Sequence, residues 1–196
     1  METRKKEYVD LIKENISKRA NTDKVMWFSM WFLLTIITFG FALFPMIYFL
    51  IERRNRHFQR QKELEDLILS VLKGNHTNLE TETTYISPKR NALLWTLSAP
   101  LIVPVFLIAY HLSKDLLLHE RRQKCLFNKI LPDENIPEQK INPRLYLLIT
   151  IVTMGVGMIY WFYKIFNAYN NHFKEQWKIE NRLIELFEGR TDKYAH

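Results

Sequence analysis

Three long stretches of the chain contain no Asp, Glu, Lys or Arg: residues 25–51, 91–112 and 145–163. An uncharged apolar run of about 18 residues or more is a candidate membrane segment, because a helix rising about 1.5 Å per residue needs about 20 residues to cross the hydrocarbon layer. The mean hydropathy of −0.19 conceals these stretches, since all 28 Lys and Arg residues lie outside them. The sequence therefore predicts a membrane protein.

The chain also repeats itself. Residues 33–69 align without a gap onto residues 148–184, and 11 of the 37 aligned positions are identical. A third, more diverged copy lies between them. Because a repeated sequence indicates a repeated structural unit, we expect three equivalent units. All three share a Tyr, a His nine residues later and a Gln four residues after the His, namely Tyr48, His57, Gln61, Tyr110, His119, Gln123, Tyr163, His172 and Gln176.

After each apolar segment, apolar residues recur at the spacing of a surface helix, as from Leu64 to Leu72 in the first copy. We therefore predict an all-α membrane protein with three repeats of a kinked or re-entrant apolar helical segment, each followed by a cytoplasmic amphipathic helix. The predicted boundaries are an N-terminal amphipathic helix at 1–24, repeat 1 at 25–73, a linker at 74–90, repeat 2 at 91–131, a linker at 132–144 and repeat 3 at 145–190; the membrane segments are 25–51, 91–112 and 145–163.

Each apolar segment has residues near its middle that let a helix kink or turn, and these are Thr38, Gly40, Pro100, Pro104, Thr153 and Gly155. If every segment crossed once, the two sides of the membrane would carry 14 Lys and Arg each, and the positive-inside rule would give no orientation. Hairpins that enter and leave by one face would place all the basic residues in the cytoplasm. We favour hairpins in the cell membrane and keep kinked single spans as the alternative.

The shared histidines His57, His119 and His172 could meet near a pseudo-threefold axis, where a metal or anion site would be possible because imidazole is the commonest metal ligand. Histidine at the end of a membrane helix more often bonds a carbonyl or a lipid phosphate, and glutamine can bond between packed helices. We therefore interpret the shared motif as structural or interfacial, with the tyrosines as membrane anchors. No metal site and no cofactor are predicted.

Basic residues follow the apolar segments closely, where they can contact anionic lipid head groups. The predicted head-group contacts are Arg53, Arg54, Arg56, Arg121, Arg122 and Lys164. Since the basic residues flank apolar segments, anionic lipids are better partners for the net charge of +7 than nucleic acid. Other membrane-protein subunits, or further copies of the chain, are the remaining expected partners.

The sequence contains no Walker loop, dinucleotide-binding glycine pattern or Gly-x-Ser-x-Gly, and His119-Glu120 lacks the second histidine of a zinc protease motif. No ionisable Asp, Glu, Lys or Arg lies inside an apolar segment, as coupled carriers usually require. We therefore expect a non-enzymatic integral membrane protein that acts as a scaffold, an accessory subunit of a membrane complex or a membrane-shaping protein. The alternative is a channel or small-solute carrier built around the three repeats.

The apolar segments also resemble a known group of proteins. LLTIITFGFALFPMIYFLIERRN, LLITIVTMGVGMIYWFYKIFNAYNNH and YHLSKDLLLHERRQ are similar to a family of short, uncharacterised, mainly archaeal prokaryotic membrane domains with a Thr-x-Gly and an aromatic-rich helix start. The second copy departs from this pattern because it lacks Thr-x-Gly. The resemblance implies a membrane location and no catalytic residue.

Overall fold

The computed structural model describes residues 2–73 and 87–192, and the regular structure in these two ranges is entirely helical. This confirms the all-α prediction for the described part of the chain. Residues 74–86 of the predicted first linker lie outside the described residues. The helices are α1 (Glu2–Ser17), α2 (Arg19–Thr22), α3 (Phe28–Ile37), α4 (Leu43–Lys73), α5 (Ala92–Ser98), the 3₁₀ turn η1 (Ala99–Leu101), α6 (Val103–Ile130), α7 (Pro143–Val152) and α8 (Gly157–Asp192).

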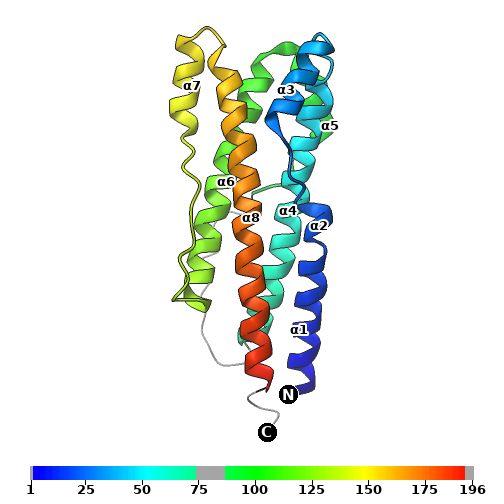
Figure 1. Cartoon of the computed structure of the whole chain (residues 1–196), viewed down its shortest axis with the longest axis vertical. Helices are drawn as coiled ribbons and strands as arrows, with labels where there is room; N and C mark the ends of the chain where they lie inside the picture. Colours follow the sequence, from blue (N-terminus) through cyan, green and yellow to red (C-terminus); the bar gives the residue numbers. More distant parts are fainter. Residues whose placement is uncertain (1, 74–86, 193–196) are drawn as a thin grey trace.

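Each apolar segment forms a helical hairpin. Short helices rise to one end of the molecule, and the long helices α4, α6 and α8 return from it side by side in the same direction (Figure 1). The pairs are α3 with α4, α5 and η1 with α6, and α7 with α8. The alternative of kinked single spans is wrong for this fold, because every apolar segment is divided between a rising and a returning limb.

The returning limb of each hairpin and the amphipathic helix that follows it form one continuous helix. No Gly or Pro occurs between residues 46 and 73 of α4 or between residues 158 and 188 of α8, so nothing in these sequences breaks the helical hydrogen bonding. The predicted boundary between apolar segment and amphipathic helix therefore falls inside a continuous helix in each repeat. Among the described helices, none combines the length and the apolar composition needed to cross a bilayer.

The Thr-x-Gly turns are built by local hydrogen bonds. The Thr38 hydroxyl donates to the Leu34 carbonyl at 2.7 Å and accepts from the Ala42 amide at 2.9 Å, which joins the end of α3 to the start of α4. Gly40 has a φ of +94°, a left-handed conformation that glycine adopts without steric cost. Its amide donates to the Thr35 carbonyl at 2.7 Å, as in the Schellman motif.

The third hairpin repeats this turn, since Thr153 bonds Ile149 and Gly157 in the same way, each at 2.7 Å, and Gly155 has a φ of +98°. The second hairpin uses proline instead. Pro100 lies in η1 and Pro104 in the first turn of α6, where a missing amide donor costs nothing.

The buried apolar residues form two clusters along the bundle. The upper cluster contains residues of the hairpins and the upper part of the long helices, including Leu50, Leu112 and Ile165 at equivalent repeat positions. In the lower cluster α1 packs against the long helices, which contribute Ile68, Ile130 and Leu183. Between the two clusters in α4, α6 and α8 lie buried polar side chains from all three repeats, and these form the candidate site.

Candidate functional site

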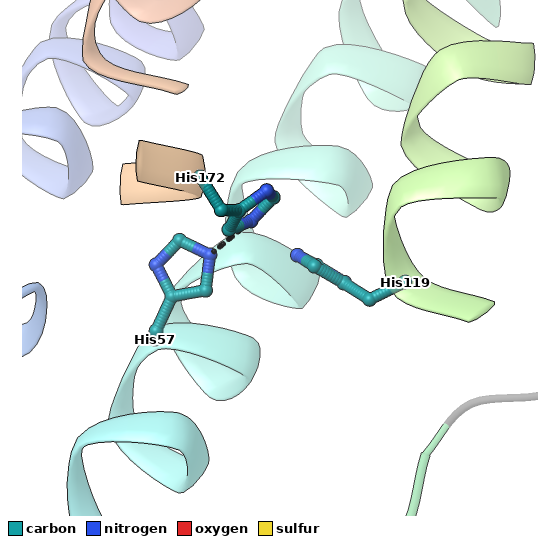
Figure 2. Close-up of side chains that lie close together, drawn as sticks. All are labelled: His57, His119 and His172. Carbon is teal, nitrogen blue, oxygen red and sulfur yellow. Dashed lines mark hydrogen bonds between the residues drawn. The ribbon is translucent and has the colours of Figure 1, made fainter. Parts of the chain in front are cut away.

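The three histidines of the repeat motif converge in the interior of the bundle. His57 on α4, His119 on α6 and His172 on α8 point toward one another (Figure 2). Their ring centroids are 5.4, 5.1 and 5.2 Å apart, so the arrangement is close to threefold. One ring nitrogen from each lies within 4.8 Å of the others. This agrees with the expectation that the three copies meet near a pseudo-threefold axis.

Two of the histidines are oriented by carboxylates. His57 Nδ1 lies 2.9 Å from Asp23 Oδ1, and His172 Nδ1 lies 3.0 Å from Glu120 Oε1. A carboxylate accepts hydrogen bonds, so in each pair we assign the proton to Nδ1. The Nε2 atoms of neutral His57 and His172 are then unprotonated. They face each other across 3.1 Å (Figure 2).

His119 has a different environment. Its ring stacks on the ring of Phe58, with centroids 4.1 Å apart and planes inclined by 24°. Its Nε2 is buried and has no hydrogen-bond partner. The same side chain lines a surface cavity of about 270 Å³, whose wall also includes Arg54, Glu65 and Arg122. His119 therefore connects the interior site with the surface.

Burial keeps the imidazoles of His57 and His119 neutral. Removal from water lowers the pKa of His57 to about 4, although the Asp23 carboxylate opposes the shift. Burial, with the neighbouring His172 and His57, holds the pKa of His119 well below its ordinary value. Both effects follow from the cost of placing a cation in a medium of low polarity. At neutral pH His57 and His119 therefore present uncharged ring nitrogens.

The three glutamines of the motif form a second layer, one helical turn from the histidines. Gln61 Oε1 accepts from Gln123 Nε2 at 2.9 Å and from Gln176 Nε2 at 3.0 Å. Gln61 Nε2 donates to Glu180 Oε1 at 2.6 Å. Arg60 then joins the two layers, because it pairs with Glu180 at 2.8 Å and with Asp23 at 2.7 Å.

The tyrosines of the motif do not join this centre. Tyr48 and Tyr110 are half-buried against the upper apolar cluster, and Tyr163 is 44% exposed. The nine-residue spacing explains this, because it places Tyr and His on opposite sides of a helix.

Two of the predicted head-group contacts need correction. Arg53 and Arg54 are 3% and 0% exposed, so neither guanidinium is available to lipid. Arg53 donates to Asn170 Oδ1 at 2.8 Å, and Arg54 pairs with Asp115 at 2.9 Å. Both lie on the inward side of α4, where the Asp115 carboxylate compensates the charge of Arg54 and the neutral Asn170 amide accepts from Arg53.

The other four basic residues lie at or near the surface. Arg56 and Arg121 are exposed. Arg122 pairs with Glu65 and is largely covered. The ammonium of Lys164 lies 5.4 Å from the centre of the Tyr160 ring.

Exposed apolar side chains gather at the hairpins. Of the 27 large apolar side chains that are exposed in the described residues, 26 lie in residues 27–49, 93–107 and 145–163, which we call the apolar end. The exception is Leu11. Phe39 and Met154 at the hairpin turns are each 95% exposed. A concentration of exposed apolar side chains of this kind is typical of surfaces that contact lipid or protein.

Sequence reasoning missed the acidic residues of the site. Asp23 follows α2, far from His57 in sequence, and no local pattern relates the two. Glu180 faces inward from α8. The equivalent position of repeat 1 is also a glutamate, Glu65, and this identity was a signal that the sequence offered. Glu120 drew attention only as part of a zinc protease motif.

The chain was compared with known proteins at the level of sequence and of fold. No protein-family model, curated protein or solved structure matches it.

Proposed function

We propose that the protein is a non-enzymatic monotopic membrane protein, which inserts the apolar end into one leaflet and holds its polar bundle outside. It would serve as a scaffold or accessory subunit of a membrane complex. The observation that carries this proposal is the segregation of exposed apolar side chains, 26 of 27 at one end of the bundle. Exposed in water, that surface would be costly at about 25 cal/mol per Å².

The length of the hairpins suits one leaflet. The rising limbs α3 and α7 are 10 residues each, and α5 with η1 spans residues 92–101. Ten helical residues rise about 15 Å, which is half of the roughly 30 Å hydrocarbon thickness. The expected re-entrant segments therefore have the dimensions of hairpins that reach the bilayer midplane.

The turns meet the main chemical requirement of insertion. Every backbone amide and carbonyl in hydrocarbon needs an internal partner, or it costs several kcal/mol. The hydroxyls of Thr38 and Thr153 each accept from one turn amide, that of Ala42 or Gly157, and donate to a carbonyl that also accepts from the threonine's own amide. This accounts for a polar residue at each of these two apolar tips.

The first charged residues of the three long helices lie at nearly equivalent heights, at Glu52 in α4, Lys114 in α6 and Lys164 in α8. Alignment of the repeats places Lys164 within one helical turn of the other two. A membrane surface is flat, so three parallel helices entering together need such a common boundary. Exposed Arg56 and Arg121 lie just beyond it, where anionic head groups are the expected partners.

Orientation follows from the hairpins. Because they return to the side from which they enter, all the described charged residues lie on one side of the bilayer. An excess of Lys and Arg favours the cytoplasmic face, so we assign the polar bundle to the cytoplasmic side of the cell membrane.

The alternative of a channel or carrier gains no support from the hairpin threonines. The hydroxyls of Thr35, Thr38, Thr150 and Thr153 all donate to carbonyls of their own helices. Leu50, Leu112 and Ile165, at equivalent positions above the histidines, are at most 1% exposed. They fill the interior with apolar atoms.

A vesicle flotation assay tests the proposal. Purified full chain, transferred from detergent to vesicles containing an anionic phospholipid, is expected to float with the lipid and to remain bound in high salt. The double variant Phe39→Asp with Met154→Asp is expected to lose most of this binding, because burying two carboxylates in hydrocarbon is unfavourable. Both positions are 95% exposed, so folding is expected to be preserved.

Leu11→Asp is the matched control, because Leu11 is the exposed apolar residue outside the apolar end and its change should leave flotation intact. Absence of flotation by the unaltered chain would overturn the proposal. So would salt-sensitive binding that the double variant leaves unchanged, since that behaviour indicates adsorption by charge alone.

A depth measurement distinguishes insertion from surface binding. The single Cys125 is exposed on the polar part of α6, so it can carry an environment-sensitive fluorophore at the native position. Phe39→Cys in a Cys125→Ser chain carries the same label at a hairpin tip. Vesicles should shift the emission of the tip label to shorter wavelength and leave the Cys125 label unchanged. Equal responses at the two positions would contradict insertion by the hairpins.

A further inference from the structure

We propose that His57, His119 and His172 together bind one divalent first-row transition-metal ion, for which Zn²⁺ is the reference ion. Three imidazoles from three helices supply borderline-soft nitrogen ligands of the kind that zinc, copper, nickel and iron accept. The site is independent of the apolar end, so the proposal does not depend on membrane insertion. It departs from the sequence-based prediction of no metal site, because that prediction allowed for the histidines to meet but did not include their carboxylate partners.

The distances between the nitrogens suit a shared ion. The Nε2 atoms of His57 and His172 are 3.1 Å apart. Two nitrogens at about 2.0–2.1 Å from a tetrahedral ion lie about 3.3 Å apart. The third ring, that of His119, supplies a nitrogen within 4.8 Å of the others. Three histidines leave one tetrahedral position for a water or an exogenous ligand.

The assigned protons on Nδ1 of His57 and His172 favour a positively charged group between their Nε2 atoms. Because Asp23 and Glu120 hold the Nδ1 protons, the two Nε2 lone pairs point at each other across 3.1 Å. Two lone pairs at that distance repel. A proton between the rings would also relieve the repulsion, but it would involve only these two nitrogens. A metal ion relieves it by accepting both lone pairs, and the third ring adds a ligand that a shared proton does not use.

The carboxylates match the outer shell of a metal site. Histidine ligands usually donate their second ring N–H to a carboxylate or carbonyl, which fixes the ring and raises its basicity. Asp23 performs this role for His57, and Glu120 for His172. Their negative charges also compensate a buried divalent cation, which three neutral imidazoles do not.

His119 provides the second independent observation. Its Nε2 is buried without a hydrogen-bond partner, and an unsatisfied buried polar atom costs about 1–3 kcal/mol. A purely structural role would favour an apolar ring stacked on Phe58 at this position. The cavity of about 270 Å³ that His119 lines places this one ring of the three beside the surface.

The test measures metal binding by the full chain in detergent. The chain is stripped with a chelator, dialysed and titrated with Zn²⁺, and the metal bound per chain is measured by elemental analysis. We expect one equivalent, together with a rise in the thermal unfolding midpoint, because a ligand that binds only the folded state stabilises it. Co²⁺ in place of Zn²⁺ should give the intense visible absorption of a tetrahedral site with nitrogen ligands.

His119→Phe is the discriminating variant. It keeps the ring that stacks on Phe58 and removes a nitrogen that has no hydrogen-bond partner, so the metal-free variant should be at least as stable as the metal-free parent. Loss of an outer-shell partner reduces metal affinity by about 10- to 100-fold. Loss of the His119 ligand should reduce the affinity for Zn²⁺ by more than that. His111→Phe is the matched control, because half-buried His111 lies outside the cluster and should leave binding unchanged.

Three results would overturn the proposal: no Zn²⁺ retained by the parent chain, equal affinity in His119→Phe, or equal loss of affinity in His111→Phe. If His119→Phe failed to fold, the Co²⁺ spectrum of the parent chain would decide alone. An octahedral spectrum, or none, would then reject the three-histidine site.

Discussion

Arg54 of the first repeat and Asp115 of the second form a fully buried ion pair, with Arg54 Nη2 2.9 Å from Asp115 Oδ2. Arg90 adds a bidentate contact, at 2.6 and 2.9 Å, to the same carboxylate. Asp115, which lies on α6, thus contacts both α4 and the segment that precedes α5. It holds the first two hairpins together just beyond the apolar end.

We predict that Asp115→Ala lowers the free energy of unfolding by about 3–5 kcal/mol, because removing one partner leaves a buried guanidinium without compensation. Chemical denaturation in a mild detergent measures the change. Asp133→Ala is the control, since Asp133 is exposed in the turn after α6 and should change stability by less than about 0.5 kcal/mol. If Asp115→Ala left the free energy of unfolding unchanged, water would be replacing the lost carboxylate beside Arg54.

Thr38→Val should destabilise the first hairpin by about 1–3 kcal/mol. The substitution keeps the shape of the side chain and removes the hydroxyl that bonds both Leu34 and Ala42, leaving the amide of Ala42 without that acceptor. Thr35→Val in the same hairpin is a matched comparison, because the Thr35 hydroxyl only donates to the Trp31 carbonyl. Equal losses from the two variants, measured by thermal unfolding, would mean that the turn hydroxyl has no special role.

Two glycine substitutions should act with opposite sign. Gly155→Ala should destabilise by about 1–2 kcal/mol, since φ is +98° and an L-residue is strained there whatever space surrounds it. Gly189→Ala should stabilise by about 0.5–1 kcal/mol, because Gly189 lies within α8 and a methyl group there meets no atom within 4 Å. Unfolding curves of the two variants recorded in one detergent provide the measurement, and the same sign for both would contradict this account of the turn.

Glu120→Gln should reduce the affinity for Zn²⁺ by about 10- to 100-fold while the chain still folds, because the amide still accepts from His172 but no longer supplies a negative charge. Glu138→Gln is the control, since Glu138 forms a surface pair with Lys124. Competition with a metal-binding dye measures both affinities. If Glu120→Gln bound Zn²⁺ with unchanged affinity, the Glu120 carboxylate would have no role in metal binding.

The sequence by itself determined the features that depend on neighbouring residues. The uncharged segments mark where the hairpins lie, and Thr38 with Gly40 marks a turn whose hydrogen bonds span only a few residues. The four-residue spacing of His57 and Gln61 places them on one helix face. The threefold repetition of this pair left open that the histidines meet near a common axis.

Tertiary structure alone decided which charges meet. Arg53 and Arg54 follow an apolar segment just as Arg56 does, yet two of these three side chains are buried and one is exposed. Asp23 reaches His57 across 34 positions, and Glu120 reaches His172 across 52. The physical reason is that the stability of a buried charge depends on partners from other helices, and which helices become neighbours is settled only when the three hairpins pack.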